Sequence, residues 1–452
     1  MTLSPSTASA VLPTSRAFPR THPRPARGWL NDPNGLCRVD GTWHVFFQYN
    51  PGSARHDAIQ WGHLSSPDLV TWQEEPVALR PQQHGPDAFG CWSGVLTVDE
   101  GRPVAVYSGV EAGDDRSRVT LATGSEDLRS WRQEGVTAAE MPADPDVVAV
   151  RDPFLFRWAG RRYALQGAGL ADGRAAILLY DAADLEDWSY LGVWLTSDHP
   201  VLSADLDASI WECPQLFEVV EGEVSRWVLI VSRWMRQEDG SGRLQDVRYI
   251  VGHMDADPDN DNDNDDDGGQ AWGAAPRFTP EACGAVDTGP AFYAPQVLAL
   301  EDRTLLWGWS WETRPEDVSD EEGWAGLLTW PRELRLDGDV LVPAPAAECA
   351  GHRREHLELT SADGTVELPD AAELRATGSD AAVRLLLRGP AGEREVWSGR
   401  AGTVVVDGSL VEVYAQDGPS HTLRAYPQDG ETWCAAVEPG AVTGWALGPS
   451  TP

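Results

Sequence analysis

Three acidic residues are separated from one another by multiples of sixty residues, and each lies in a short motif that contains turn-forming residues. Asp32 lies in WLNDPNG, Asp152 follows two such periods later in RDPF, and Glu212 follows one period after that in WECPQ. An equal interval indicates the same point of successive repeat units, and repeat units that close into a ring turn such points toward one axis. The spacing therefore predicts that carboxyl groups from distant segments converge on one site.

Two further positions complete this period. Position 92 falls in GCWSG, and position 272 becomes 287 when the acidic segment 255–269 is set aside. The residue there is Asp287, in DTGPAFYAPQ. We expect all five positions to face the axis of the ring.

Two carboxyl groups on either side of a bond are the apparatus of glycoside hydrolysis. Asp32 follows Asn31, a polar neighbour that can hold a carboxylate ionised. Glu212 lies in the apolar stretch SIWECPQLF, a setting that suits a proton donor, and Asp152 follows Arg151, which should keep it charged. Taken singly, each Asp-Pro motif is more typical of a turn; three in register favour catalysis.

The elements that position these residues are predicted to be short β-strands. An Asp-Leu-x-x-Trp core recurs in SPDLVTW, SEDLRSW and AADLEDW at nearly the same interval, which is typical of propeller blades with long loops. Aromatic and β-branched runs recur once per unit. We predict an all-β protein with a five-bladed β-propeller over residues 21–345, its recurring strands at 42–50, 103–110, 161–170, 226–234 and 303–311.

The remaining parts of the chain are predicted from composition and alternation. Alternating segments such as 381–389 indicate a small C-terminal β-sandwich over residues 355–452, in which Glu412 is expected to be an exposed strand residue. Residues 1–20 are expected to be a flexible N-terminal extension. The segment 255–269 is predicted to be a low-complexity insertion and not a calcium loop, because the residue in its twelfth ligand position is not Glu.

The composition excludes several classes of partner. A formal net charge of −36 disfavours nucleic acid and anionic membranes, since phosphate would be repelled. No apolar stretch is long enough to span a bilayer, and the N-terminus lacks the apolar region of a secretory signal. Six cysteines without C-x-x-C spacing indicate free thiols in a reducing compartment. We expect a cytoplasmic protein; its oligomeric state stays open.

An ordered set of motifs carries a family resemblance. WLNDPNG, FFQYNP, WGHLSSPDL, RDPF, WECPQ, FYAPQ and GWAGLLTWPREL together resemble glycoside hydrolase family 32, the β-fructofuranosidases, which include invertases, levanases, inulinases and sucrose-phosphate hydrolases. The resemblance covers residues 22–334 and implies a five-bladed propeller followed by a β-sandwich. It also implies retention through a fructosyl-enzyme intermediate, with Asp32 as nucleophile, Glu212 as acid/base and Asp152 as transition-state stabiliser. Retaining enzymes place the two reacting carboxyl groups about 5–5.5 Å apart.

The same resemblance implies a small carbohydrate as the partner and neither a metal ion nor a cofactor. By the same matching, polar side chains should hydrogen-bond the fructosyl unit and two tryptophans should wall it: Asn31, Gln48, Ser93 and Arg151, then Trp92 and Trp309.

Two residues depart from the family pattern. Ala291 stands where many relatives carry Asp, and His56 stands where many carry Trp. Both put the substrate in doubt and leave the catalytic carboxyls untouched. We therefore expect terminal β-fructosyl release from sucrose or short fructo-oligosaccharides, with a fructan exo-hydrolase or a fructosyltransferase as the alternatives. A binding propeller without catalysis is disfavoured, because such a module needs no nucleophile and acid in register.

Overall fold

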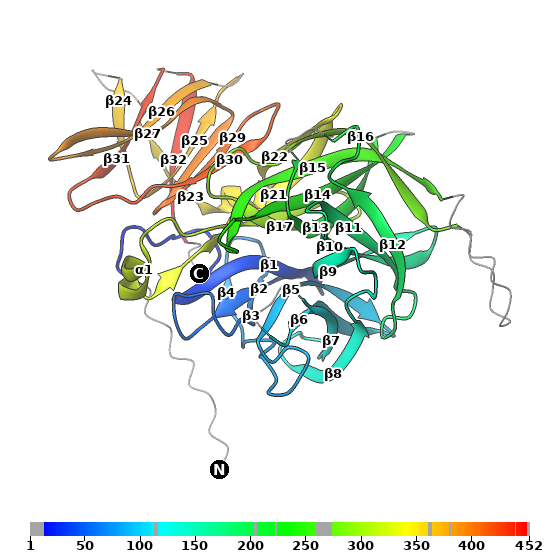
Figure 1. Ribbon diagram of the computed structural model, residues 1–452. Coiled ribbons are helices and arrows are strands. Elements are labelled where there is room, and N and C mark those ends of the chain that lie inside the picture. Colours follow the sequence, from blue (N-terminus) through cyan, green and yellow to red (C-terminus); the bar gives the residue numbers. More distant parts are fainter. Residues whose placement is uncertain are drawn as a thin grey trace, which may run out of the picture.

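A computed structural model of the protein describes residues 13–112, 116–202, 206–221, 224–257, 274–359, 364–378, 381–438 and 440–449. Residues 1–12 of the expected N-terminal extension lie outside these ranges, as does the predicted acidic insertion from residue 258 onward. Over the described residues the strands form seven sheets, five in the part of the chain up to residue 345 and two in the remainder (Figure 1).

The first five sheets follow one another along the chain. Their strands are β1 (Gly28–Val39), β2 (Thr42–Asn50), β3 (Gln60–Ser66) and β4 (Gln73–Glu74); β5 (Gly90–Asp99), β6 (Arg102–Val110), β7 (Arg118–Gly124) and β8 (Trp131–Ala139); β9 (Val147–Trp158), β10 (Arg161–Leu170), β11 (Ala175–Asp181) and β12 (Ser189–Thr196); β13 (Ile210–Glu221), β14 (Val224–Arg236), β15 (Gly242–Ala256) and β16 (Pro276–Ala285); and β17 (Tyr293–Ala299), β18 (Thr304–Ser310), β20 (Leu327–Leu328), β21 (Arg332–Asp337) and β22 (Val340–Pro345). The helix α1 (Glu316–Glu322) follows β18, and no helix in the described part of the chain is long and apolar enough to cross a membrane.

These five sheets close into a ring. The first strand of each sheet contacts the first strand of the next, and β17 returns to contact β1. Closure is secured by β19 (Trp324–Ala325), which pairs in parallel with the start of β1 although the two strands come from opposite ends of the propeller sequence. A ring of sheets linked through their first strands is a β-propeller, and here it has five blades.

Each first strand carries a β-bulge at the same point. In every case two residues stand opposite one residue of the second strand, at positions 31–32, 92–93, 152–153, 213–214 and 294–295. In the last three blades the first bulge residue has positive φ: 61° at Asp152, 47° at Cys213 and 45° at Ala294. Because bulges re-aim side chains locally, five of them in register supply the wall of a central site.

The bulges correct the predicted phase in two respects. Glu212 precedes its bulge, Asp152 is the first residue of its bulge and Asp32 is the second, so the three carboxyls occupy successive positions and not one. The fifth position falls at Ala294, and Asp287 lies outside the ring of bulges. The fourth blade is longer than the others even after segment 255–269 is left out of the count. One equal period counted from Glu212 therefore ends before Ala294.

The Asp-Leu-x-x-Trp repeat is confirmed as a structural unit. It connects the third and fourth strands of the first three blades. In two of them the indole N–H donates to the leucine carbonyl, from Trp131 to Leu128 and from Trp188 to Leu185, each at 2.9 Å. Both leucines are buried, so the repeat anchors the outer turn of each blade.

The C-terminal domain is a two-sheet sandwich. One sheet has the order β23 (Arg353–Leu357), β32 (Val442–Leu447), β25 (Ala371–Ala376), β28 (Thr403–Asp407), β29 (Leu410–Tyr414) and β30 (Ser420–Arg424); the other has β24 (Thr365–Leu368), β31 (Thr432–Val437), β26 (Ala381–Gly389) and β27 (Gly392–Ala401). A 3-10 helix over Ala347–His352 joins it to the propeller. The sandwich packs against the propeller on the side of the fifth blade (Figure 1).

Two expectations for this region were wrong. Glu412 is fully buried and accepts hydrogen bonds from Arg332 at 2.6 Å and from His22 at 2.8 Å. The described end of the N-terminal extension is packed, since the buried Phe18 ring contacts Trp324 edge-on at 5.2 Å. Both residues look exposed or flexible in the sequence because their burial depends on the docking of two domains.

Candidate active site

A cavity of about 320 Å³ opens where the bulges of the first strands meet. Eight of the nine predicted site residues line it: Asn31, Asp32, Gln48, Trp92, Arg151, Asp152, Glu212 and Trp309. Ser93 lies just behind this lining and hydrogen-bonds Asp32. The ring of blades thus gathers side chains from the first blade to the last.

Asp32 is buried and heavily hydrogen-bonded. Its Oδ2 accepts from Ser93 Oγ at 2.6 Å and from Gln48 Nε2 at 3.1 Å, and its Oδ1 accepts from Asn31 Nδ2 at 3.1 Å. Burial raises the pKa of Asp32 to about 6, the charge of Glu212 adds to the rise, and the hydrogen bonds offset part of it. Asp32 can therefore act as a carboxylate at neutral pH, at some cost in folding free energy.

Asp152 is held by the neighbouring blade. Its Oδ2 accepts from the backbone N–H of Cys213 at 2.9 Å, and its own N–H donates to Ser108 Oγ at 2.8 Å. Burial and the charge of Glu212 raise the pKa of Asp152 to about 7. Arg151 pairs with Glu212 and lowers the pKa of Asp152 by less than burial raises it. Arg151 therefore does not hold Asp152 fully charged as expected, and the carboxylate form is present only in part at neutral pH.

Glu212 has a partner on each carboxyl oxygen. Oε1 accepts from Arg151 Nε at 2.8 Å, and Oε2 accepts from the Tyr293 hydroxyl at 2.7 Å. The three residues hold equivalent places, one position before the bulge of the third, fourth and fifth blades, which explains why they meet. Tyr293 was missed as a site residue, although its place in FYAPQ at the start of the fifth unit was a usable signal.

The Cys213 thiol lies between two of the carboxyls. Its sulfur is 3.6 Å from Asp32 Oδ2 and 3.5 Å from Asp152 Oδ2. Burial raises the pKa of Cys213 far above its usual value, so the group stays a neutral thiol and can donate to either carboxylate. It separates two acidic groups without adding a third charge.

Aromatic side chains form the outer wall of the cavity. Trp29 contacts Trp309 with ring centroids 5.8 Å apart, and His56 lies between Trp29 and Trp92 at 5.9 and 6.1 Å. Sequence reasoning missed the further lining residues Trp29, Trp234 and Leu244. Trp29 was visible in WLNDPNG; the other two come from cross-strand pairing of β14 with β15, which no local pattern predicts.

The two residues that depart from the family pattern lie in different places relative to the cavity. His56 lines the cavity, in keeping with a role at its rim. Ala291 is fully buried, lies outside the lining and donates its N–H to the carbonyl of Thr422 in the sandwich. Ala291 therefore makes no direct contact with the cavity in the described part of the chain, and its effect on substrate preference stays a prediction. Among the described residues, no group of three or more His, Cys, Asp or Glu side chains is arranged to hold a metal ion.

Buried carboxyls gathered around a cavity walled by aromatic rings define a site of the glycoside hydrolase class. Residues 22–345 match the model of the glycosyl hydrolases family 32 N-terminal domain. The chain therefore belongs to glycoside hydrolase family 32 and is a glycoside hydrolase.

One relative and one solved structure extend this match over nearly the whole chain. A sucrose-6-phosphate hydrolase of Klebsiella pneumoniae is 29% identical over 464 residues, covering 96% of this chain and 94% of its own. The insoluble β-fructofuranosidase isoenzyme CWINV3 of Arabidopsis thaliana is 32% identical over 72% of this chain and 55% of its own. Among solved structures, the β-fructofuranosidase BmSUC1 of Bombyx mori superposes with a TM-score of 0.75 at 25% identity, covering 97% of this chain and 96% of the other. The match spans both the propeller and the sandwich.

Proposed function

We propose that the protein is a retaining β-fructofuranosidase that releases terminal fructosyl units from sucrose or short fructo-oligosaccharides. The observation that carries the proposal is the convergence of Asp32, Asp152 and Glu212 on one cavity of about 320 Å³, a volume suited to a small sugar. The family membership supports the same reaction class.

In the first step, an Asp32 oxygen attacks the anomeric carbon of the fructosyl unit. The bond from that carbon to the bridging oxygen breaks, and protonated Glu212 gives its proton to the leaving oxygen. The product is a fructosyl ester of Asp32 together with the released sugar. Asp152 accepts hydrogen bonds from fructosyl hydroxyls and stabilises positive charge at the anomeric carbon as the bond breaks.

In the second step, water hydrolyses the fructosyl ester of Asp32. Glu212, now a carboxylate, removes a proton from the water molecule while the water oxygen attacks the anomeric carbon. Asp32 leaves as a carboxylate, and the enzyme returns to its starting state. Arg151 and Tyr293, which contact opposite oxygens of Glu212, hold that carboxyl through both proton transfers.

Charge in the cavity supports a neutral substrate over a phosphorylated one. Arg151 is the single arginine among the described side chains that line the cavity, and it is paired with Glu212. A phosphate would meet acidic groups and no uncommitted arginine within that lining. All six cysteines are free thiols, which supports a reducing compartment, and we place the reaction in the cytoplasm.

The test compares initial rates of fructose release at matched concentrations of sucrose, sucrose 6-phosphate, 1-kestose, inulin and levan. A kcat/KM for sucrose or 1-kestose at least tenfold above the others supports the proposal. A preference for sucrose 6-phosphate would overturn the charge argument, and a preference for inulin or levan would make the protein a fructan exo-hydrolase. Absence of fructose release from every substrate would refute the proposal.

A further inference from the structure

A strand of the C-terminal sandwich runs along the segment that leads into the fifth blade. Residues 286–292 lie beside β30, and Asp287 forms an isolated parallel bridge with Ser420. The Thr288 N–H donates to the Ser420 carbonyl at 2.8 Å, and the Ala291 N–H donates to the Thr422 carbonyl at 3.1 Å. The sandwich thus extends its sheet with a piece of the propeller.

Buried side chains fasten the same segment. Asp287 Oδ2 accepts from Thr422 Oγ1 at 2.6 Å, from Ser420 Oγ at 2.8 Å and from Arg332 Nη1 at 2.9 Å. The side chains of Asp287 and Arg332 have no exposed surface. At Gly289 an added Cβ would meet the Thr422 carbonyl oxygen at 2.0 Å, so the two backbones are as close as glycine permits.

This fastened segment ends directly at the active site. Phe292 packs under the Arg332 guanidinium, whose carbon is 4.5 Å from the ring centroid. The next residue is Tyr293, whose hydroxyl donates to Glu212 at 2.7 Å. A continuous set of buried contacts therefore connects β30 to a carboxyl of the cavity.

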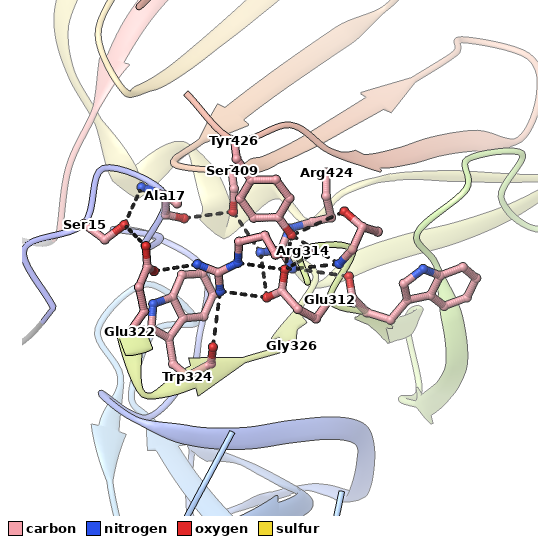
Figure 2. Close-up of polar contacts among 12 residues, drawn as sticks. Ser15, Ala17, Glu312, Arg314, Glu322, Trp324, Gly326, Ser409, Arg424 and Tyr426 are labelled. Carbon is pink, nitrogen blue, oxygen red and sulfur yellow. Dashed lines mark hydrogen bonds and ion pairs between the residues drawn. The ribbon is translucent and has the colours of Figure 1, made fainter. Parts of the chain in front are cut away.

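The same end of the sandwich also holds the loop after β18, as Figure 2 shows. Arg424 Nη1 donates to the carbonyls of Ser310 and Trp311 at 3.4 Å, and the Tyr426 hydroxyl donates to Glu312. The Trp311 ring contacts that of Tyr293, with centroids 5.9 Å apart.

Glu312 in turn forms a two-pronged ion pair with Arg314, at 2.9 Å for both bonds. Trp311 also contacts Trp309, which lines the cavity, with ring centroids 6.2 Å apart. Residues 286–292 lead to Tyr293, and the loop after β18 carries Trp311. Both segments are thus held by β30 or by the residues just after it.

We propose that β30 of the sandwich positions Tyr293 against Glu212, and that Thr422 is a positioning residue for the proton transfers of catalysis. This inference rests on the proposed acid/base role of Glu212. An inert buttress would affect only folding stability, whereas a positioning strand changes turnover and its pH dependence in the folded enzyme.

The test is a double-mutant cycle between Thr422→Val and Tyr293→Phe, with kcat and KM measured on sucrose from pH 4 to 9. Thr422→Val keeps the backbone bonds and removes the hydroxyl that contacts Asp287 and Arg332. We expect Tyr293→Phe to lower kcat about tenfold or more, because a hydrogen bond to a charged group is lost. Thr422→Val should lower kcat about three- to tenfold and leave KM within twofold. It should also shift the pH profile of kcat in the same direction as Tyr293→Phe does.

The double variant should be no slower than Tyr293→Phe alone, because the two changes act through one contact. Additive losses, or an unchanged pH profile in Thr422→Val, would overturn the proposal. The matched control is Leu385→Ala in β26, a buried residue of the sandwich sheet that does not contain β30, which should lower the melting temperature and leave kcat and the pH profile unchanged. Should Thr422→Val fail to fold, Ser420→Ala removes a second hydroxyl from the same Asp287 oxygen and serves in its place.

Hydrogen exchange read by mass spectrometry gives a result that does not depend on turnover. Thr422→Val should speed exchange in residues 286–293 and also in residues 210–215 around Glu212, which no described sandwich strand pairs with. Leu385→Ala should change neither segment. Unchanged exchange around Glu212 would refute the link even in an active enzyme. If the wild-type protein releases no fructose but Thr422→Val still speeds exchange in both segments, the proposed reaction is refuted while the mechanical link between β30 and Glu212 stands.

Discussion

Replacing Asp32 with Asn should abolish turnover and at the same time stabilise the folded protein at neutral pH. The first effect follows from loss of the nucleophile. The second follows from the pKa of Asp32, which burial raises from an ordinary value of 3.8 to about 6. A carboxyl whose pKa is higher in the folded state favours folding when protonated and opposes it when ionised. Its destabilising effect therefore grows as pH rises from about 4 to 6 and is constant above.

The size of the effect follows from these two values. At pH 7 the ionised Asp32 destabilises the fold by about 3 kcal/mol, and at pH 4 by less than about 1 kcal/mol. Asn is the same size, but its amide nitrogen faces the Asn31 donor, and losing that hydrogen bond costs about 1 kcal/mol. The net gain is about 2 kcal/mol at pH 7, and at pH 4 the lost hydrogen bond outweighs the gain and leaves a small net loss.

Differential scanning calorimetry at the two pH values measures this gain. The unfolding entropy of a chain of 452 residues is about 1 kcal/mol/K, so a gain of about 2 kcal/mol raises the melting temperature by about 2 °C. Asp57→Asn, which neutralises an exposed carboxylate next to His56, is the control and should shift it by less than about 0.5 °C. The reasoning fails if Asp32→Asn melts below the wild type at pH 7, gains equally at pH 4 and 7, or retains more than about 1% of wild-type turnover.

Three further outcomes are expected. Glu212→Gln should slow sucrose hydrolysis about 10²–10⁴-fold and spare fructosyl fluoride, whose leaving group needs no proton; equal losses on both substrates would contradict the acid role. Burial lowers the pKa of His22, but hydrogen bonds to Asp407 and Glu412 outweigh it and raise the pKa to about 9, so the stabilising effect of His22 is full below pH 6.5 and is lost as pH rises through 9. The difference in unfolding free energy between the wild type and His22→Gln should therefore shrink by about 2–3 kcal/mol between pH 7 and pH 10, and a constant difference would contradict the assignment. Trp234→Ala should raise KM for sucrose about tenfold with a smaller change in kcat, because the wall loses its ring; an unchanged KM would exclude Trp234 from the substrate site.

Much of the fold and most of the site could be predicted from the sequence. The sixty-residue period, the Asp-Leu-x-x-Trp repeat and one aromatic strand per unit encode blades locally, since strand alternation and turns depend on neighbouring residues. The motifs around Asp32, Asp152 and Glu212 brought the three carboxyls to one cavity as expected. The separation of the Asp32 and Glu212 carboxyls that retention requires stays a prediction.

What only the tertiary structure decided is which partner each side chain meets. The bulges offset the three carboxyls by one position each, and this offset gives Arg151 to Glu212 and leaves Asp152 to the Cys213 backbone. A one-residue shift in a strand changes the direction of every following side chain, and the sequence carries no local mark of it.

The docking of the sandwich was equally invisible in the sequence. It buries Glu412, holds Asp287 at the contact between the two domains and fixes the segment that leads to Tyr293. Residues in one sequence pattern can be exposed or fully buried depending on the surface that a second domain covers. The sequence therefore determined the chemistry available to this protein, while the packing of its two domains decided how that chemistry is held in place.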